Sequence, residues 1–476
     1  MRKDGFDIKQ IHHFIHFTDE ELELIIRDFA AKGGKVVCIS TSFIAQRIPP
    51  ALRMNSERPG GIMWGVSPKG IDVYKKLLQI CKVAKLICKC KVVMGGWEIE
   101  KRKFYSSNMK SWGLDVLRHV VDCFVEGYGS NVIKKIALDQ PIKTDQNKLI
   151  QSDAIIDFSD MSSAPILADN IEQGESLMFE IASGCIFSCH FCNFGSLGKK
   201  KHEYMRSYES LKTELVSNYE NFGTRMYNLT DNIGNDYLEK MKWLVRIKDE
   251  TGIDFKWSGY VRLDTIKNRE QAQILKDSGM VGALMGIESM TPSVGKYIGK
   301  MTDGERIKDL LRMCRDVWKD DALIYGMFIA GLPTETKEMT IETFSYLTSE
   351  EGRDLIDSFK FSRLAIEGDL DNKNEINKAR GGPFRDYEVR SASDWNSPWH
   401  NSAEIEKITN HINHYENQKT DINAHNIAQI CNLGYTPEEA LMLARSGMKR
   451  GDYDYYGKTA AKYRDYRNRI MAEINP

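Results

Sequence analysis

The sequence predicts an α/β protein with an N-terminal doubly wound parallel sheet, a central partial barrel and a mostly helical C-terminal region. Two observations predict this class. Short apolar runs alternate with amphipathic segments in the N-terminal part of the chain, and the same alternation returns in the middle. Repeated strand–helix units favour parallel strands, because each helix returns the chain to the start of the next strand. We expect a doubly wound domain, a linker, a partial (β/α)6 barrel and a helical region at residues 1–140, 141–175, 176–367 and 368–476.

The charges nearly cancel, with 66 lysines and arginines against 67 aspartates and glutamates in 476 residues. This balance argues against broad electrostatic capture of nucleic acid or of an anionic membrane surface. No apolar run approaches the ~18 residues needed to span a bilayer, and no apolar N-terminal segment suggests secretion. We therefore expect a cytoplasmic protein whose cysteines do not form disulfides in that reducing compartment.

The N-terminal region begins with a helical lead-in and continues with three strand–helix units. Thr18-Asp19-Glu20-Glu21 is typical of a helix start. The expected strands are 35–40, 91–94 and 121–127, and the expected helices are 72–83, 112–120 and 131–137. This order implies a parallel, doubly wound sheet.

Six strands are expected in the central region. They cover residues 177–181, 225–229, 255–262, 282–289, 323–330 and 358–364. Six strands imply a split barrel, which leaves a lateral opening for a large substrate. Polar residues stand at the ends of several of these strands, where catalytic groups collect in barrels.

Three cysteines follow the first of these strands in a Cys-x3-Cys-x2-Cys pattern: Cys185, Cys189 and Cys192. A cubane iron–sulfur cluster takes four ligands, so three thiolates would leave one iron open to another ligand. A zinc site completed by His190 or His202 stays open at this point, as does a chance group of buried cysteines. The spacing favours the cluster.

Two further motifs follow the cysteines in order: Gly286-Ile287-Glu288-Ser289 and Gly331-Leu332-Pro333-Thr334-Glu335-Thr336. Together the three motifs resemble those of the radical S-adenosylmethionine family. The resemblance implies that the cysteines hold a [4Fe-4S] cluster whose free iron chelates S-adenosylmethionine. It implies a 5′-deoxyadenosyl radical that abstracts hydrogen from a substrate, with rearrangement, cyclisation or carbon–carbon bond formation as the outcome.

The resemblance also implies partners and cofactor contacts. A reducing partner such as flavodoxin or ferredoxin would supply the electron, and the substrate would be a small molecule, a nucleoside or a peptide. Phe191 matches the family's aromatic residue near the adenine, and Lys300 resembles a lysine that pairs with the cofactor carboxylate or with Glu288. Arg262 resembles an arginine of the family, with an ion pair to Asp264 as the alternative. The complete set of expected cofactor contacts is Phe191, Asp231, Asn232, Ser258, Arg262, Glu288, Ser289 and Lys300.

The N-terminal region resembles the cobalamin-binding domain of one large branch of that family. The match lies in the Gly95-Gly96 pair after a strand and in the run from Val121 to Ser130. Two departures matter. The stretch Ser40–Arg47 lacks the histidine that can ligate cobalt, and Ser130 replaces a glutamate. Some members of that branch bind cobalamin without a protein ligand.

Three functions therefore remain. The leading expectation is a cobalamin-independent radical enzyme whose N-terminal domain only packs on the barrel or shapes the substrate entrance. A cobalamin-dependent radical methyltransferase is the alternative. A non-catalytic iron–sulfur or zinc protein is the third, and it would not bind S-adenosylmethionine.

Overall fold

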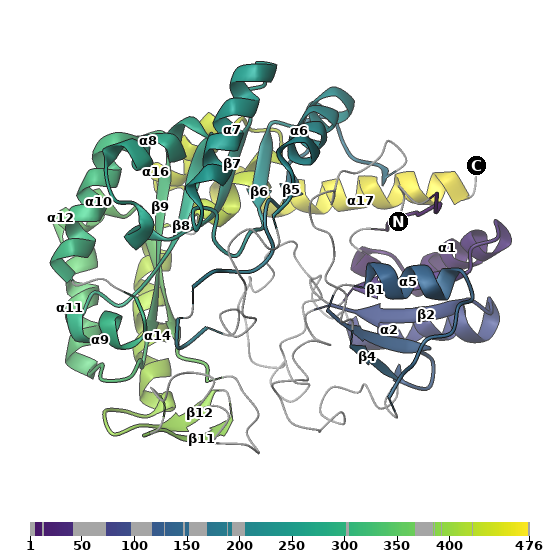
Figure 1. Ribbon diagram of the computed structural model, residues 1–476, viewed down its shortest axis with the longest axis horizontal. Coiled ribbons are helices and arrows are strands. Elements are labelled where there is room, and N and C mark those ends of the chain that lie inside the picture. Colours follow the sequence, from purple (N-terminus) through teal and green to yellow (C-terminus); the bar gives the residue numbers. More distant parts are fainter. Residues whose placement is uncertain are drawn as a thin grey trace. The chain divides into compact units, whose positions relative to one another are not determined.

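The computed structural model of the chain is shown in Figure 1. It describes residues 5–11, 14–40, 73–96, 117–127, 129–145, 148–151, 169–187, 189–192, 205–300, 304–366, 384, 386–391, 393–420 and 422–474. The stretch 41–47, most of the helix expected at 112–120, and His202 lie outside these residues. The chain forms two compact units: unit 1 contains Met1–Ile156, Ala168–Asn170 and Thr459–Pro476, and unit 2 contains Asp157–Leu167 and Ile171–Lys458. The domain boundaries expected from the sequence stay a prediction.

Unit 1 is built on a four-stranded parallel sheet in the order β1-β2-β3-β4. Its strands are β1 (Val36–Ser40), β2 (Lys91–Gly95), β3 (Cys123–Glu126) and β4 (Leu149–Gln151). The three strands expected from the sequence are present, and β4 is a further one. The helices are η2 (Phe14–His16), α1 (Asp19–Ala31), α2 (Val73–Lys82), the π-helical turn η4 (Val83–Ile87) and α5 (Ser130–Ala137).

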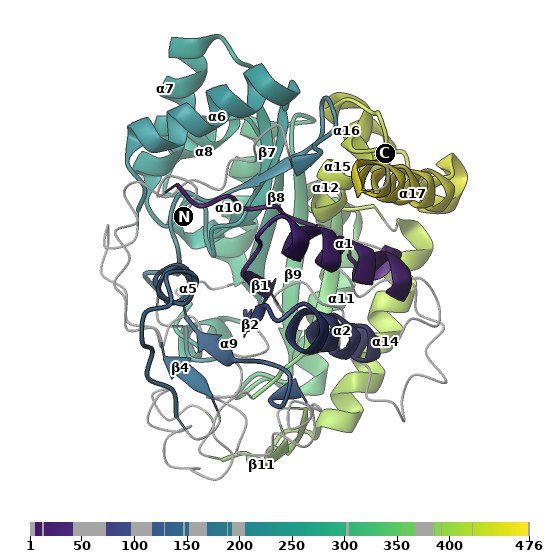
Figure 2. The ribbon, with the colours of Figure 1, turned by 90° about the vertical axis from the view of Figure 1, so that its right-hand side faces the viewer.

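Two distant parts of the chain meet in unit 1. Thr18 caps α1, accepting from the Glu21 N–H at 3.2 Å while its own N–H donates to the Glu21 carboxylate at 2.8 Å. The same carboxylate forms a bidentate ion pair with Arg467 of α17 (Tyr455–Ile474), with both contacts at 2.7 Å. Ile470 of α17 is fully buried in the core of this unit, and Figure 2 shows this helix close to end-on. The last helix therefore stabilises the N-terminal unit.

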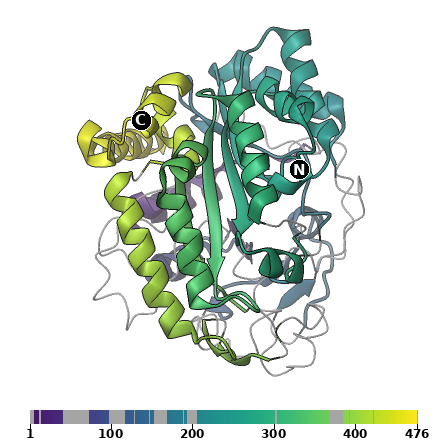
Figure 3. The ribbon, with the colours of Figure 1, turned by 90° about the vertical axis from the view of Figure 1, so that its left-hand side faces the viewer.

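Unit 2 is built on a six-stranded parallel sheet in the order β10-β9-β8-β7-β6-β5 (Figure 3). The strands are β5 (Leu177–Phe179), β6 (Met226–Leu229), β7 (Lys256–Val261), β8 (Met280–Glu288), β9 (Leu323–Ala330) and β10 (Ser358–Arg363). All six expected strands are present. Within the described residues the edge strands β5 and β10 do not pair with each other, so the sheet forms a partial barrel, as the sequence predicts.

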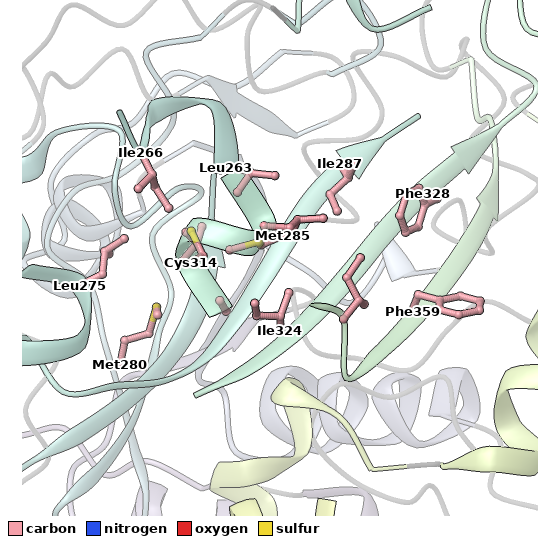
Figure 4. Packing of buried hydrophobic residues seen from close by; sticks show 14 of the residues in the cluster. Leu263, Ile266, Leu275, Met280, Met285, Ile287, Cys314, Ile324, Phe328 and Phe359 are labelled. Atoms are coloured by element: carbon pink, nitrogen blue, oxygen red, sulfur yellow. The ribbon is translucent and has the colours of Figure 1, made fainter. Parts of the chain in front are cut away.

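Helices connect these strands and cover one face of the sheet, here called the outer face. They are α6 (Tyr208–Phe222), α7 (Leu238–Thr251), α8 (Arg269–Asp277), α9 (Pro292–Tyr297), α10 (Gly304–Trp318), α11 (Lys337–Thr348) and α12 (Glu350–Leu355). Met285, Ile324 and Phe328 point into the core beneath them (Figure 4). Each such side chain contributes roughly 1.5–3 kcal/mol on burial. None of the helices in the described ranges is long and apolar enough to cross a membrane.

The C-terminal region contributes to the opposite face of the sheet, here called the inner face. It contains the hairpin β11 (Glu388–Ser391) and β12 (Asp394–Asn396), followed by α14 (Ser402–Lys419), η10 (Ala424–Asn426), α15 (Ile427–Cys431), α16 (Pro437–Arg445) and η11 (Arg450–Tyr453). Ala424 and Ile427 pack with Leu284 and Tyr325 of the sheet. The expected helical region is present, and the hairpin is an addition to it.

Candidate active site

The cysteine loop lies between β5 and α6, where the sequence places it. Asp231, after β6, fixes the start of this loop by accepting hydrogen bonds from the N–H groups of Ile181 at 2.7 Å and Ala182 at 3.1 Å. Asp231 also pairs with buried Lys240 at 2.8 Å. Burial lowers the pKa of Lys240, but Asp231 and Asp236 raise it above its ordinary value, so this lysine stays charged.

The geometry around Asp231 favours a positioning role. Its side chain has no exposed surface, and its oxygens are engaged by the cysteine loop and by Lys240. The neighbouring Asn232 is half-buried in the turn after β6. Of the two residues, Asn232 is therefore the better placed for a cofactor contact, and that contact remains a proposal.

Arg262, directly after β7, contacts the cysteine loop. Its Nη1 donates to Cys189 Sγ at 3.0 Å, and its guanidinium carbon lies 3.9 Å from the centre of the Phe187 ring. Its other nitrogens hold Asp264 at 2.6 and 2.8 Å. Burial lowers the pKa of Arg262, but its bonds to Asp264 and its contact with Cys189 raise that pKa overall. Arg262 therefore places a buried positive charge directly against the second cysteine of the loop.

Glu288 and Lys300 form a buried ion pair at the carboxyl end of β8. Their side-chain atoms lie 2.9 Å apart, and Lys300 also donates to the Gly286 carbonyl. Glu288 has a φ of +67°, a left-handed conformation that is uncommon for residues other than glycine. Strained backbone of this kind concentrates at functional sites. Contact of Glu288 and Lys300 with the polar part of a cofactor stays a prediction.

The two serines of the expected set are engaged elsewhere. Ser289 donates to Glu335 at 3.1 Å, and Glu335 accepts from the Gly331 N–H at 2.9 Å. Burial raises the pKa of Glu335 to about 7. Ser258 donates to Asn228 at 3.0 Å on the inner face, below the strand ends. Both serines therefore support the sheet and its turns.

His190, considered as a zinc ligand, links the cysteine loop to α9. Its Nδ1 lies 2.9 Å from the Tyr297 carbonyl, and its N–H donates to the Ile298 carbonyl at 3.0 Å. Phe191 is half-buried and packs on the edge of the main core. In the described residues, no three His, Cys, Asp or Glu side chains come close enough to share one metal ion.

The donor set fits an iron–sulfur cluster. The Phe187 N–H donates to Cys185 Sγ at 3.4 Å, and Arg262 donates to Cys189, so two of the three sulfurs accept hydrogen bonds suited to thiolates. Burial raises the pKa of the Cys185 thiol, which means that metal binding has to provide the free energy for its deprotonation.

Sequence reasoning missed two features of this site. Lys240 and Phe187 belong to no recognised motif, and each reaches its partner only because of the fold. The signal for Lys240 was present but weak, since a lysine on the buried face of a helix needs a carboxylate partner. No signal in the sequence pointed to Phe187.

Residues 179–347 match the radical SAM superfamily. A curated relative, an uncharacterized methyltransferase of Pyrococcus horikoshii, is 30% identical over 166 residues. These residues are 34% of this chain and 34% of the relative, so the match spans about a third of that protein.

Two groups of solved structures share the fold. TsrM of Kitasatospora setae is a radical S-adenosylmethionine methyltransferase solved with its tryptophan substrate and a cofactor analog, and also with cobalamin and a [4Fe-4S] cluster. It is similar at a TM-score of 0.57 and 14% identity, over 77% of this chain and 69% of that chain. OxsB, a cobalamin-dependent radical enzyme, is similar at a TM-score of 0.50 and 12% identity, over 88% of this chain and 60% of that chain.

The partial barrel, the cysteine loop and the order of the motifs agree with this match, and they place a radical SAM domain at residues 179–347 of this chain. A domain of this superfamily implies a [4Fe-4S] cluster and S-adenosylmethionine as cofactors.

Proposed function

We propose that this enzyme is a cobalamin-dependent radical methyltransferase. The likeness to TsrM carries the proposal, because unit 2 makes up less than two thirds of the chain while the likeness covers 77% of it. The likeness must therefore include part of unit 1. The relative from Pyrococcus horikoshii, also described as a methyltransferase, supports the same outcome.

The ends of the strands in unit 1 suit a large cofactor. Gly95 and Gly96 end β2, and Gly127 follows β3. Gly96 and Gly127 have φ of +98° and +83°, which glycine adopts without strain. A glycine also lets a ligand approach the backbone closely. These residues would hold cobalamin, and Ser40–Arg47, which has no histidine, would leave the lower face of cobalt without a histidine ligand from that stretch.

The residues of unit 2 would then hold the other two cofactors. Cys185, Cys189 and Cys192 would bind the cluster, while Glu288 and Lys300 would bind the polar groups of S-adenosylmethionine. When bound, the cofactors supply the electron, the radical and the methyl carrier. The chain's own residues orient them and keep water from the reacting atoms.

The test is anaerobic purification with hydroxocobalamin, followed by cluster reconstitution and incubation with dithionite and S-adenosylmethionine. We expect corrin absorbance to co-purify with the wild-type protein, and S-adenosylhomocysteine to form with 5′-deoxyadenosine. Gly96→Val should lose the corrin because a branched side chain is strained at this φ. Gly252→Ala, at another positive φ but with open space around it, is the matched control.

The second candidate is a cobalamin-independent rearrangement, cyclisation or carbon–carbon bond formation. The missing histidine in Ser40–Arg47 favours it. Formation of 5′-deoxyadenosine with neither corrin binding nor S-adenosylhomocysteine would support this candidate and contradict the first. Absence of both products, with an intact reduced cluster, would contradict both.

A further inference from the structure

The C-terminal region places a histidine against the inner face of the six-stranded sheet. The short helix η10 contacts β7, β8 and β9, and it carries His425. This approach depends on Gly282 of β8. A Cβ at that position would lie 2.9 Å from the Ser258 Cβ and 3.0 Å from the Ala424 Cβ, closer than side chains pack.

His425 contacts two tyrosines at one level of the sheet. Its ring centre lies 6.0 Å from that of Tyr260, at 78°, and 5.7 Å from that of Tyr325, at 72°. Tyr260 and Tyr325 flank Leu284 in the strand register, so the three sheet residues share one level and one face. The three polar rings therefore form a single layer, here called the Tyr–His–Tyr layer.

The polar atoms of this layer lack partners. Throughout the described ranges, no hydrogen bond reaches the His425 ring, the Tyr260 hydroxyl or the Tyr325 hydroxyl. Tyr325 is only 6% exposed, whereas Tyr260 and His425 are half-buried and keep access to a ligand. None of these atoms is among the fully buried polar atoms that lack a partner, so they are accessible to solvent, and a ligand could take the place of that solvent as their hydrogen-bond partner.

The layer is uncharged at neutral pH. Burial, together with the nearby Lys360 ammonium, lowers the pKa of His425 to about 4. Burial raises the pKa of Tyr260, as does the Glu288 carboxylate, and burial likewise raises the pKa of Tyr325, with smaller effects of Tyr260 and Glu416. Neutral imidazole and phenol groups can donate and accept hydrogen bonds but give little attraction to an ionic group.

The layer lies below the cofactor residues on the same face. Tyr260 precedes Arg262 by two residues, which is about 7 Å along a strand, and side chains two apart point to the same side. Arg262 is the residue that contacts Cys189. A small ligand resting on the layer would therefore extend toward the cysteine loop.

We propose that Tyr260, Tyr325 and His425 form a substrate subsite that holds an uncharged, planar ring with a hydrogen-bonding edge. The proposal rests on the proposed function, since it places the substrate of that reaction. The aromatic rings of the layer provide an apolar surface against which a flat, apolar ligand can pack. The neutral imidazole and the two hydroxyls can hydrogen-bond to one N–H or carbonyl group on the edge of that ligand.

The test uses indole as the probe, with indene as its matched analogue that lacks the N–H. Binding to the reconstituted full-length protein is measured by saturation-transfer NMR for the wild type, Tyr260→Phe, Tyr325→Phe and His425→Phe. We expect indole to bind more tightly than indene, and the variant that removes the acceptor of the indole N–H to weaken indole binding by about fivefold, the value of one hydrogen bond. Binding of indene should stay within twofold. Tyr415→Phe, at an exposed tyrosine away from the layer, is the control.

Several outcomes would overturn the subsite: no binding of indole, equal binding of indole and indene, indole binding unchanged in all three variants, or tighter binding of indole-3-acetate. The tyrosine variants change one oxygen atom each, and their melting temperatures verify folding. Cleavage of S-adenosylmethionine by the wild type is measured separately. Absence of that cleavage contradicts the proposed function, whether or not indole binds. Cleavage together with indole binding that none of the three variants weakens contradicts only the subsite.

Discussion

The two parallel sheets of this chain carry different types of residue at the carboxyl ends of their strands. At the carboxyl end of the six-stranded sheet, Arg262, Glu288 and Lys300 are buried charges. In the four-stranded sheet, Gly95-Gly96 and Gly127 stand at the strand ends. Buried charges need ionic partners, so the first edge suits thiolates and a charged cofactor. Glycines expose backbone, so the second suits a ligand that packs closely against the chain.

The largest difference between the sheets should appear in their cysteines. Cys189→Ala should abolish cluster assembly and reduce formation of 5′-deoxyadenosine to background, because it removes one of three ligands. Cys88→Ser, in the four-stranded unit and half-buried, is the matched control. Iron content and the EPR signal of the reduced cluster are the measurements. Comparable loss in both variants would contradict the assignment of the cluster to unit 2.

The second prediction compares two aspartates in similar settings. Asp231 accepts from the Ile181 N–H and pairs with Lys240, while Asp122 accepts from the Val92 N–H and pairs with Lys85. Asp231 has no exposed side-chain surface, whereas that of Asp122 is 27% exposed.

Asp231→Asn should destabilise unit 2 by roughly 3–5 kcal/mol, because it leaves the Lys240 charge buried beside fewer carboxylates. Asp122→Asn should cost about 1 kcal/mol, since water screens the Lys85 charge. Urea unfolding of each unit, followed by hydrogen exchange, measures both. Equal losses would show that burial of the pair does not set its contribution.

A third prediction concerns pH. The pKa of Glu335 is raised by burial to about 7, above the usual value for glutamate. Native protein therefore holds a proton that unfolded chain has released, so stability is fully present below about pH 4.5 and is lost as pH rises through 7.

Between pH 5 and 7.5 this loss should be roughly 2–3 kcal/mol for the wild type, and Glu335→Gln should remove that dependence. The measurement is the slope of the free energy of unfolding against pH. The absolute free energy is not compared, because the glutamine also alters the hydrogen bonds to Gly331 and Ser289. Glu209→Gln, on the start of α6, is a control for the general effect of removing a carboxylate. An unchanged slope in the Glu335 variant would contradict the assignment.

Local pattern predicted much of unit 2. Apolar periodicity located all six strands, and the spacing of the cysteines located their loop. For Lys300 the family resemblance offered two partners, the cofactor carboxylate and Glu288, and the structure contains the pair with Glu288.

Contacts between distant loops were not predictable in this way. Arg262 and Cys189 are 73 residues apart, and the sequence suggested only the neighbouring Asp264 as a partner of this arginine. His425 reaches the sheet because Gly282 leaves room for η10. Such contacts depend on register and on the close approach of backbones, which periodicity does not encode.

The smallest predicted effect tests the contact between Arg262 and Cys189. Arg262→Gln removes a positive charge and a hydrogen bond from Cys189, and both favour the reduced, more negative cluster. Its midpoint potential should fall by on the order of 50 mV, which corresponds to about a tenfold change for one electron. An EPR-monitored redox titration measures the shift, and Arg246→Gln, on an exposed part of α7, is the control.

Arg262→Lys sharpens this comparison, because it keeps the charge but loses the fork that holds Asp264. A potential near that of the wild type would assign the effect to charge, and one near that of Arg262→Gln would assign it to geometry. An unchanged potential in both variants would mean that Arg262 only holds Asp264 and does not affect the cluster.

Burial raises the pKa of Cys123 in the four-stranded sheet to about 12. Cys189, by contrast, accepts a hydrogen bond from the Arg262 guanidinium at 3.0 Å, and this contact supports the proposal that unit 2 holds the cluster.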